Sequence, residues 1–469
     1  MGHGTRNWHS LQVSCLRRQF AQGSGLPFSE VLSAEMVQEV LEEVGGFFRE
    51  RVFTPLTTVW VFLSQVTSAD GSCRDAVMRL LAFLASRGEK LCSPGTGSYC
   101  KARKRLPERI LSRLTQKIAA RMTRETPAKW RWHGREVKVV DGTTLSMPDT
   151  QANQKVYPQS RSQKPGLGFP KVRLVCLFSL ATGAVLDAAL GPCRGKGKGE
   201  LSLFRKLRSR LQAGDLLLGD RHFCAYFDIA AWLRLGVDFV GRLHQARRDD
   251  LRYGKRLGRG DRLVEWSRPK QRPRWLSRRA YRRMPETLTL RLIRVMVAQP
   301  GFRTRRITVV TTLLDCQIYP VAEVAALYRA RWHAELDLRS LKVTLAMDVL
   351  RGKTPQIVRK EIWAHLLAYN LIRTVIAQAA MQHDVLPRSL SFKAALQTIH
   401  AFEIPLLLCS PSGLHDLYSA MLSTIASQHV GNRPDRFEPR ARKRRPKPYP
   451  HLTIPRHEAK TALLETSSA

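Results

Sequence analysis

The chain is 469 residues long and 43% of them are hydrophobic, which is enough material for the cores of roughly two to four domains. Lysine and arginine number 78 against 38 acidic residues, so the formal net charge is +40. A charge this one-sided opposes compaction unless a polyanion neutralises it. It therefore favours nucleic acid as the partner, and argues against a membrane surface or a merely solubilising role.

The N-terminal part of the chain is predicted to be helical after an opening stretch, residues 1–28, that carries no assignable pattern. Apolar residues recur at helical spacing in EVLSAEMVQEVLEEV, TPLTTVWVFLSQV and CRDAVMRLLAFLASR, which predicts a compact helical domain over residues 29–130. The basic charge and the helix that closes this domain make it the expected DNA-binding domain. It closes with a basic helix for which Ser98 is the expected N-cap. This helix either reads sequence as part of a helix-turn-helix-like unit or touches phosphates without reading sequence. Its basic residues are Lys101, Arg103, Lys104 and Arg105.

Residues 131–243 alternate strands with helices and predict the first part of an α/β core. The order, three strands and then helix, strand, helix, strand, is that of a ribonuclease-H-like fold. Asp141 is expected at the end of the first strand and Asp220 directly after the fourth, and these two strands are neighbours in such a fold. The expected strands are Val137–Val140, Val172–Leu180, Ala184–Leu190, Leu216–Leu218 and Val237–Leu243, and the expected helices are Leu201–Leu211 and Cys224–Leu235.

Residues 244–319 interrupt this pattern with an arginine-rich stretch that contains two strand-like segments, LTLRLIRVMVAQ and RRITVVTTLLD. They predict a β-rich insertion, after which residues 320–382 return to the core. Such an insertion accounts for the long interval between Asp220 and Glu335, which is too great for an uninterrupted fold of this kind.

The remainder of the chain is predicted to be helical and then basic. Helices are expected at Lys360–Met381 and Phe392–Phe402, the second within a C-terminal helical region, residues 383–430. The longest apolar stretch falls in the first of these helices and is interrupted by polar residues, so a buried helix is expected rather than a membrane span. Residues 431–469 form a basic tail, of which Gly431–His457 is expected to be extended or partly disordered.

Cysteine usage and the N-terminus both point to the cytoplasm. The nine cysteines are scattered, odd in number and without a Cys-x-x-Cys pair. They therefore predict reduced structural thiols rather than disulfides or zinc ligands. The N-terminal sequence has no apolar core of the signal-peptide type.

The segment YRARWHAELDLRSLK carries the most informative spacing in the chain. On an α-helix, four of its residues fall within an arc of roughly 60°. They are Tyr328, Arg331, Glu335 and Lys342. A lone acid framed by phosphate-binding groups is what an enzyme needs in order to hold a metal against a nucleic-acid backbone. On the same helix, Glu335 and Arg339 are expected to form an ordinary stabilising pair.

The pattern Y-x-x-R-x-x-x-E-x-x-x-x-x-x-K resembles the signature of the insertion-sequence-4 transposases, a bacterial group of DDE recombinases. The upstream acids that end VKVVD and DLLLGD agree with it, and the resemblance extends to SYCKARKRLP and RRPKPYPHLTIPRHEAK. It implies a DNA transposase that cleaves the ends of its element and transfers the strands by a cut-and-paste mechanism. A β-rich insertion before the helix of Glu335 is also a feature of this family.

The resemblance makes Asp141, Asp220 and Glu335 the catalytic residues and metal ligands. Three carboxylates without histidine or cysteine favour Mg²⁺ or Mn²⁺. Two ions are expected, to activate a water or a 3′-hydroxyl and to stabilise the departing oxygen, with Asp141 contacting both. The expected contacts to DNA are Tyr328, Arg331 and Lys342 on this helix and Lys101, Arg103 and Lys104 in the N-terminal domain.

Each acid taken alone has a structural interpretation. Asp141 begins an Asp-Gly pair that often forms a turn, and Asp220 can pair with the arginine that follows it. Two nearby acids are not expected to substitute for the triad. Asp337 lies on the other side of the helix from Glu335, and Asp215 begins the strand that Asp220 ends.

Several residues beside the expected site have less certain roles. His222 and His333 are expected to be ordinary core or surface histidines, and Trp332 is expected to pack or to cover its neighbours. Members of the family can hold a flipped base against an aromatic ring of the insertion. The candidates here are Trp266, Trp275 and Phe302.

The expected partner is double-stranded DNA, both the terminal inverted repeats and the target, in the nucleoid of a bacterial cytoplasm. Joining two ends to one target implies at least a homodimer when the protein is assembled on DNA. Two alternatives remain open. One is a nuclease of the same fold without strand transfer, and the other is an inactive or domesticated sequence-specific DNA-binding protein.

Overall fold

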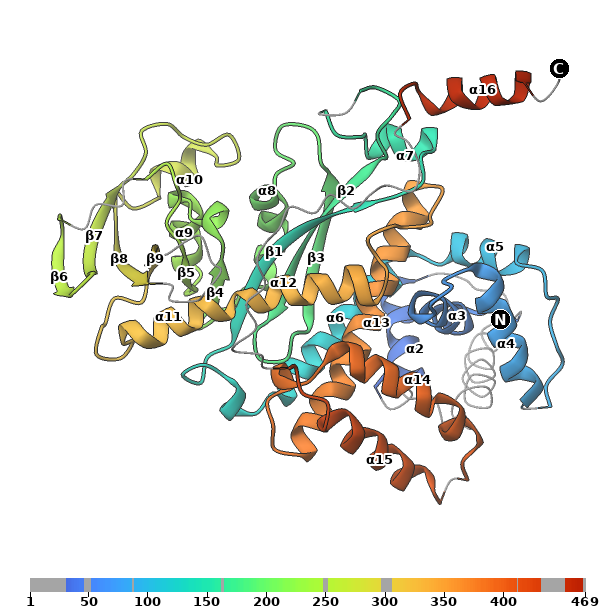
Figure 1. Ribbon diagram of the computed structural model, residues 1–469. Helices are drawn as coiled ribbons and strands as arrows, with labels where there is room; N and C mark the ends of the chain where they lie inside the picture. Colours follow the sequence, from blue (N-terminus) through green and yellow to red (C-terminus); the bar gives the residue numbers. More distant parts are fainter. Residues whose placement is uncertain are drawn as a thin grey trace, which may run out of the picture. The chain divides into compact units, whose positions relative to one another are not determined.

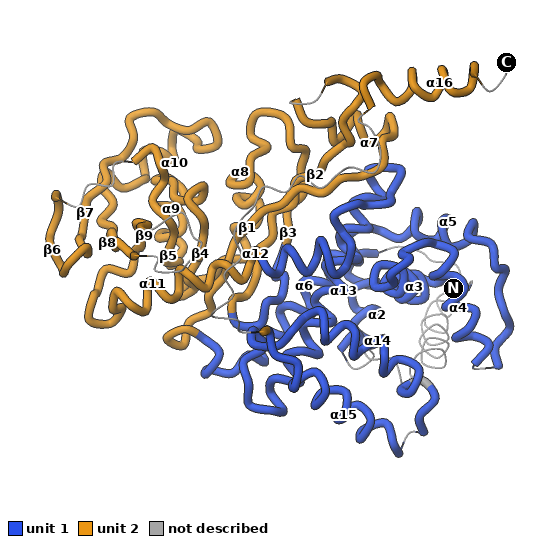
Figure 2. The backbone as a smooth tube through the Cα atoms, in the orientation of Figure 1, with its two compact units in different colours: residues 1–131, 181–187, 336–430 blue, residues 132–180, 188–335, 431–469 orange. Residues whose placement is uncertain are grey.

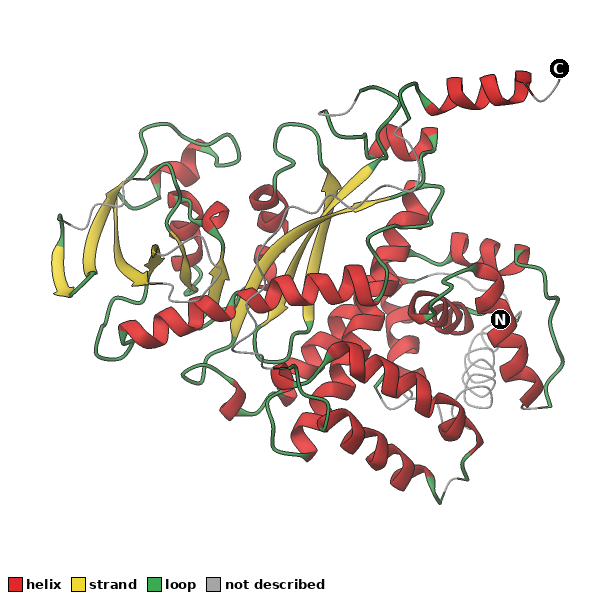
Figure 3. Ribbon diagram, in the orientation of Figure 1, coloured by secondary structure: helices red, strands yellow, loops and turns green. Residues whose placement is uncertain are grey.

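The computed structural model describes residues 31–45, 52–86, 88–161, 164–247, 252–296, 306–410, 412–431 and 452–466. Over these ranges the chain is a mixed α/β protein with a large sheet and many helices (Figure 1, Figure 3). It divides into two compact units, coloured separately in Figure 2. Unit 1 comprises residues 1–131, 181–187 and 336–430, and unit 2 comprises residues 132–180, 188–335 and 431–469. Residues 1–28, Phe302 and most of the basic tail lie outside the described residues.

Unit 1 is built from helices, and the expected helical segments are confirmed. The side chain of Thr54 caps the helix Pro55–Thr67 (α3) by accepting a hydrogen bond from the Thr57 N–H, and Pro55 occupies the first turn. Its helices are α2 (Ala34–Val44), α3 (Pro55–Thr67), α4 (Cys73–Ser86), α5 (Gly97–Arg105), α6 (Glu108–Glu125), α13 (Pro355–Gln382), α14 (Phe392–Leu408) and α15 (Leu414–Ala426), with the short turns η2 (Ala128–Trp130), η5 (Ser340–Thr344) and η6 (Pro387–Ser389). Most side chains of α13 are buried. Among the residues described, no helix has the length and apolarity needed to cross a membrane.

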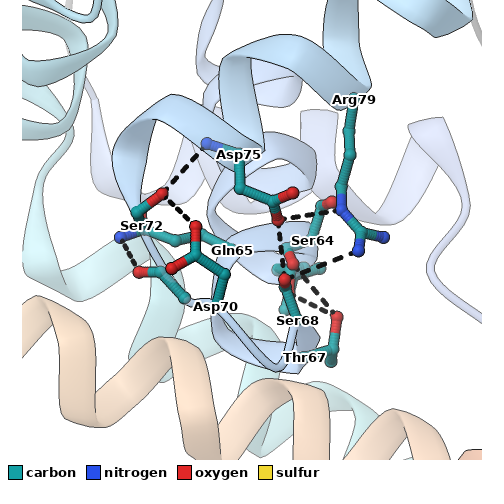
Figure 4. A network of polar contacts seen from close by, with 10 residues as sticks. Ser64, Gln65, Thr67, Ser68, Asp70, Ser72, Asp75 and Arg79 are labelled. Atoms are coloured by element: carbon teal, nitrogen blue, oxygen red, sulfur yellow. Dashed lines mark hydrogen bonds and ion pairs between the residues drawn. The ribbon is translucent and has the colours of Figure 1, made fainter.

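A polar network fixes the turn between α3 and α4 (Figure 4). The Ser68 hydroxyl donates to Asp75 Oδ2 over 2.6 Å, and Arg79 Nε donates to the same oxygen over 3.0 Å. Gln65 Nε2 donates to the Gly71 carbonyl over 2.9 Å. Gly71 has φ +60°, a conformation that favours glycine, so the turn is specified by its sequence.

Unit 2 contains most of a nine-stranded sheet in the order β3-β2-β1-β4-β5-β9-β8-β7-β6. β1 pairs antiparallel with β2 and parallel with β4, and β4 is also parallel to β5. The strands are β1 (Val137–Ser146), β2 (Lys171–Ser179), β3 (Val185–Pro192), β4 (Leu216–Gly219), β5 (Asp238–Arg242), β6 (Lys255–Gly258), β7 (Asp261–Ser267), β8 (Thr287–Met296) and β9 (Arg306–Thr311). All five strands expected before residue 244 are observed.

The first strand is longer than its apolar run predicts. β1 continues to Ser146 because the residues from Gly142 onward pair with β2 as far as Lys171. The expectation that Asp141 ends its strand is therefore wrong, and so is the alternative that it begins a turn. The pairing of β1 with β4 ends at Val139 and Leu218, and β1 itself continues. Asp141 lies on β1 just beyond this last pair.

The strands of the insertion extend the same sheet. β9 pairs antiparallel with β5, and β8, β7 and β6 follow outward in antiparallel order. A buried ion pair ties this extension together, with Arg291 Nη2 placed 2.7 Å from Asp261 Oδ2. Arg291 Nη1 also donates to the Tyr319 carbonyl over 2.7 Å, which fixes the segment leading into α11.

The helices of unit 2 are mostly short. The helix expected at Leu201–Leu211 is observed as α8 followed by a 3-10 turn, η3. The last turn of this segment is held to the sheet, because Lys138 Nζ donates to the Arg210 carbonyl over 2.7 Å. The tail segment described from residue 452 becomes helical at Arg456. The helices and turns are α7 (Gln151–Val156), α8 (Glu200–Phe204), η3 (Arg205–Arg210), η4 (Arg221–Phe223), α9 (Tyr226–Leu233), α10 (Arg278–Arg282), α11 (Val321–Ala330), α12 (Trp332–Arg339, which crosses into unit 1) and α16 (Arg456–Thr466).

Asp337, on α12, is a buried ionic anchor of unit 1. Its Oδ1 accepts hydrogen bonds from Arg388 over 2.6 Å, Arg373 over 2.7 Å and the Tyr369 hydroxyl over 2.9 Å. Burial acts to raise the pKa of Asp337, but the charges of Arg388 and Arg373 outweigh it and the pKa lies below its ordinary value. A carboxyl with a lowered folded-state pKa stabilises the fold above its unfolded-state pKa of about 3.9. That contribution is lost as the pH falls through the folded-state value.

Asp337→Ala is expected to lower the free energy of unfolding by about 3–5 kcal/mol, because it leaves two arginines without their buried partner. Denaturant unfolding near neutral pH measures this loss. Arg339→Ala, at an exposed position of the same helix, is the control and should change stability by less than about 0.5 kcal/mol. Equal stability of the two variants would contradict the anchoring role.

Candidate active site

Asp141 and Asp220 are placed at the same level by the parallel pairing of β1 with β4. Val139 is opposite Leu218, so two residues further on Asp141 is level with Asp220. Neighbouring strands are about 4.8 Å apart, and residues at equivalent positions point to the same face. The two carboxylates that the sequence predicts to lie close together are therefore brought together within unit 2.

The segment around Glu335 is helical, but the expectation of one continuous α-helix is wrong. α11 ends at Ala330 and α12 begins at Trp332, with Arg331 at the junction, and a π-helical turn, η5, follows from Ser340. At the junction the Arg331 N–H bonds the Tyr328 carbonyl, a tighter spacing than that of an α-helix. The roughly 60° arc computed for an ideal helix therefore does not describe these residues, and Lys342 lies on the π-helical turn, in unit 1.

Arg331 links two of the three acids. Its Nη2 donates to Glu335 Oε1 over 2.7 Å, and its Nη1 lies 3.8 Å from Asp141 Oδ2. The side chains of Arg331 and Asp141 are only 15% and 16% exposed. Glu335 thus pairs with Arg331, one turn before it, and not with the expected partner Arg339, one turn after it.

The three acids are coupled electrostatically. Burial raises the pKa of the Asp141 carboxyl to about 6. The charges of Glu335 and Asp220 act in the same direction, whereas the hydrogen bond from the Gly142 N–H and the charge of Arg331 act against it. The Arg331 pKa is raised, because Tyr328, Glu335 and Asp141 outweigh the effect of its burial.

Asp220 directly follows β4 and caps the turn η4. Its Oδ1 accepts from the His222 N–H over 2.8 Å, and its Oδ2 lies 2.9 Å from His222 Nδ1. His222 is therefore a partner of a predicted catalytic acid, which the sequence interpretation did not assign to it. The sequence does show that His222 stands two residues after an acid that follows a strand. At this spacing the side chains of a tight turn can meet, so the contact was predictable.

Tyr328 lies close to the same group of charges. Its phenol is largely buried, and burial raises the Tyr328 pKa against the opposing charges of Arg331 and Arg242. The charge of Asp220 also acts on it. Arg242, the last residue of β5, was not singled out from the sequence, since an arginine that ends a strand carries no pattern of its own.

A metal site is not already assembled around these acids. No three His, Cys, Asp or Glu side chains of the described residues are grouped closely enough to hold a metal ion. Two reasons are visible: Glu335 is directed to Arg331, and Asp220 is engaged by His222. The carboxylate oxygens nevertheless suit a hard divalent cation by their chemistry.

The two acids not expected to substitute for the triad have structural roles. Asp215 Oδ2 lies 2.6 Å from Lys138 Nζ in a buried pair that fastens β4 to β1. Asp337 is the buried anchor described above. Gly142 is required for a different reason, since a Cβ there would lie 2.8 Å from the Glu200 side chain. Successive residues of a strand point to opposite faces, so Glu200 lies on the face of β1 away from Asp141.

The basic helix α5 presents its cations in different directions. Lys101 and Lys104 are exposed, as is Arg105. Arg103 instead turns inward, where its guanidinium donates to Gln65 Oε1 over 3.1 Å and lies 4.9 Å from the centre of the Tyr99 ring. These contacts give Arg103 a structural role and do not favour it as a DNA contact. The expected N-cap is wrong, since Thr96 precedes the helix and Ser98 lies inside it.

The aromatic candidates of the insertion are both covered by arginine. The Arg247 guanidinium lies 3.5 Å from the centre of the Trp266 ring, and that of Arg205 lies 4.1 Å from the centre of the Trp275 ring. An arginine therefore covers one face of each of these two rings. Phe302, the third candidate, lies outside the described residues. Trp332, expected to pack or to cover its neighbours, is 46% exposed beside Arg331.

The eight cysteines in the described part of the chain are free thiols, in line with the sequence expectation. They are Cys73, Cys92, Cys100, Cys176, Cys193, Cys224, Cys316 and Cys409. Burial raises the pKa of Cys224 to about 11, which keeps that thiol protonated and unreactive.

Known proteins similar to this chain are transposases. The family described as "Transposase DDE domain" matches residues 132–371, which is more than half of the chain. Transposase InsG for insertion sequence element IS4, of Escherichia coli (strain K12), is 27% identical over 430 residues, covering 90% of this chain and 92% of that protein. The transposase for insertion sequence element IS421, of Escherichia coli, is 35% identical over 96 residues, or 20% of this chain and 25% of that protein. The cryo-EM structure of a piggyBac transposase synaptic complex with hairpin DNA has a TM-score of 0.43 at 10% identity, covering 85% of this chain and 84% of that chain. The family match includes Asp141, Asp220 and the segment of Glu335, and the chain belongs to the DDE transposases of the insertion-sequence-4 family.

Proposed function

We propose that this transposase cuts DNA at the ends of its element and transfers the freed strands to a target by a cut-and-paste mechanism. Asp141, Asp220 and Glu335 are its catalytic residues in this proposal. The observation that carries it is the level placement of Asp141 and Asp220 on adjacent parallel strands, with Arg331 linking Asp141 to Glu335. Coupled, partly buried acids of this kind are characteristic of functional sites rather than of surface ion pairs.

The proposed core is ribonuclease-H-like, which the strand order β3-β2-β1-β4-β5 supports together with the antiparallel β1–β2 and parallel β1–β4–β5 pairings. Residues 131–243 and 320–382 would form this core around the insertion of residues 244–319. We assign DNA binding to the helical segment 29–130, with residues 383–430 as a C-terminal helical region and 431–469 as a basic tail. Residues 1–28 have no assigned role.

Mg²⁺ or Mn²⁺ is the proposed cofactor, held as two ions by Asp141, Asp220 and Glu335. Such ions would activate a water or a 3′-hydroxyl and stabilise the departing oxygen. Glu335 must exchange its ion pair with Arg331 for this role, which would release the guanidinium. Arg331 is then available to a phosphate of the DNA as a two-pronged donor. Tyr328 and Lys342 are the other proposed phosphate contacts of this segment.

The proposed partners are the terminal inverted repeats of the element and a target duplex, bound by a homodimer in the bacterial cytoplasm and nucleoid. Lys101 and Lys104, which are exposed on α5, are the N-terminal candidates for contacts to phosphates. Arg103 is a weaker candidate because of its inward contacts.

The deciding experiment incubates the purified protein with Mg²⁺ and a duplex that carries the inverted repeats flanking its gene. Strand cleavage followed by joined products on a gel supports the proposal. Cleavage without joined products would indicate a nuclease of the same fold. Specific binding without metal-dependent cleavage would indicate a domesticated DNA-binding protein, and would overturn the proposal.

DNA affinity is expected to fall steeply as salt increases, because the chain carries a formal charge of +40 and binding releases condensed counterions. Six to ten phosphate contacts would reduce affinity by about 10³–10⁵ between 50 and 200 mM salt. Titration of a labelled end duplex at several salt concentrations measures this slope. An affinity that does not change over this range would mean that the charge serves another partner.

A further inference from the structure

Unit 2 contains a second site, an open cleft with several charged lining residues, all of them separate from those around Asp141. It has a volume of about 1110 Å³ and lies between the loop around α7 and the start of α16. In the part of the chain that the structure describes, it is lined by one acid, Asp149, and by four cations. The cations are Arg161, Arg194, Arg456 and Lys460. This charge suits an anion, and the volume exceeds the roughly 300–1,000 Å³ of pockets for small molecules.

The start of α16 lines this cleft. In the ribbon, α16 follows the chain close to α7 (Figure 1). Arg456 Nη1 donates to Asp149 Oδ2 over 2.9 Å, and its guanidinium lies 3.9 Å from the centre of the Phe169 ring. Pro455 packs against Gly166 so closely that a Cβ on this glycine would lie 2.9 Å from Pro455 Cβ. The acid of the cleft is therefore neutralised internally, which leaves the charges of the remaining cations for a ligand.

Two glutamines fix the opposite wall. Gln154 Nε2 donates to Asp149 Oδ1 over 2.7 Å and to the Gly168 carbonyl over 3.0 Å. Gln159 Nε2 donates to the Lys164 carbonyl over 2.8 Å, and its Oε1 accepts from the Gly168 N–H over 3.1 Å. A wall held in this way loses little conformational entropy when a ligand binds, so the cleft is preorganised.

The position of the cleft relative to Asp141 follows from β1. The strand from Asp141 to Ser146 spans about 17 Å at roughly 3.4 Å per residue, and Asp149 follows shortly after it. Successive base pairs of a duplex are also about 3.4 Å apart. A DNA backbone with its reacting phosphate at Asp141 would reach the cleft roughly five to eight nucleotides away.

We propose that this cleft binds the sugar–phosphate backbone of the DNA substrate, about five to eight nucleotides from the reacting phosphate, and that the C-terminal segment from Pro455 to Lys460 completes it. The inference rests on the proposed function, since the interval is counted from the phosphate that is cut. The contact is independent of base sequence, because the cations of the cleft are suited to phosphate oxygens and only base-edge contacts would read sequence. An extended backbone fits several cations spaced along an open cleft better than a single small anion does.

The test uses two double variants. The cleft variant combines Arg194→Glu and Lys460→Glu, and the control variant combines Arg234→Glu and Lys206→Glu. All four side chains are exposed in unit 2, and both variants change the net charge equally, but Arg234 and Lys206 do not line the cleft. Affinity for an end duplex is measured at several salt concentrations. The cleft variant should bind about 10- to 100-fold more weakly at low salt. Its affinity should also fall less steeply with salt, so that the slope of log affinity against log salt is smaller in magnitude by about two. The control should change the slope by clearly less.

Phosphate ethylation of the duplex then locates the contact. Ethylation about five to eight nucleotides from the cut should weaken binding by the parent protein and have no further effect on the cleft variant. Equal slopes for the two double variants, or no effect of ethylation in this interval, would overturn the inference. Failure of the parent protein to cleave with Mg²⁺ would overturn the proposed function instead, and the binding comparison would still decide whether the cleft holds DNA.

Discussion

Asp141→Asn, Asp220→Asn and Glu335→Gln should each reduce DNA cleavage to the uncatalysed background while leaving DNA binding nearly unchanged. Each substitution removes a proposed metal-binding charge and keeps the shape of the side chain. The first two positions are held by the β1–β4 pairing, which the substitutions do not disturb. Cleavage of a labelled end duplex in Mg²⁺ measures the loss, and a binding titration of the same variants shows whether they remain folded.

Glu200→Gln is the matched control, since Glu200 is an acid close to Asp141 in space but on the opposite face of β1. This variant should cut DNA at nearly the rate of the parent protein. Mg²⁺-dependent cleavage that persists in any of the three triad variants would remove that residue from the catalytic assignment. Loss of cleavage in the control would mean that general disturbance of β1, rather than metal binding, explains the result.

Arg331→Ala should slow cleavage by about 100-fold, the cost expected when a reacting group is misplaced by about 1 Å. The substitution keeps all three acids but removes the cation that links Glu335 to Asp141. It also removes the proposed contact to a phosphate beside the cut. Single-turnover cleavage on preassembled protein–DNA complexes separates this effect from weaker binding.

Two further variants test the geometry of this residue. Arg331→Lys keeps the charge but lacks the planar fork that reaches two carboxylates, so its rate should fall between those of the parent protein and Arg331→Ala. Arg339→Ala, at an exposed position of α12, should have a mild effect. If Arg331→Ala cut DNA as fast as the parent protein, the guanidinium would be only a structural element of the helix.

The placement of the site was predictable from the sequence where it depends on strand order. Two apolar runs that each end at an acid stand first and fourth among the expected strands, in the order of three strands, helix, strand, helix, strand. In a ribonuclease-H-like fold this order predicts that the two strands are parallel neighbours. The level position of Asp141 and Asp220 follows from that pairing. The spacing within YRARWHAELDLRSLK likewise identified Glu335 and Arg331 as members of one site.

The local geometry was not predictable, because it depends on interactions between segments distant in sequence. β1 continues past Asp141 only because β2 provides a partner as far as Ser146. The break at Arg331 accompanies an ion pair with Asp141, which is far away in the sequence. The inward turn of Arg103 depends on Gln65 and Tyr99 from other parts of unit 1. Propensity and periodicity carry no information about such pairings.

The continuous sheet of unit 2 limits how this chain can change during evolution. β9 covers the edge of β5, so removal of the insertion would expose unpaired backbone groups on β5, the neighbour of the strand that precedes Asp220, a hazard for aggregation. On this side of the sheet the edge strand is instead β6, where Lys255 and Arg256 are exposed and discourage the addition of another chain. Sequence can therefore be gained at this outer border with little penalty. Loss of the insertion would require a new edge strand beside β5.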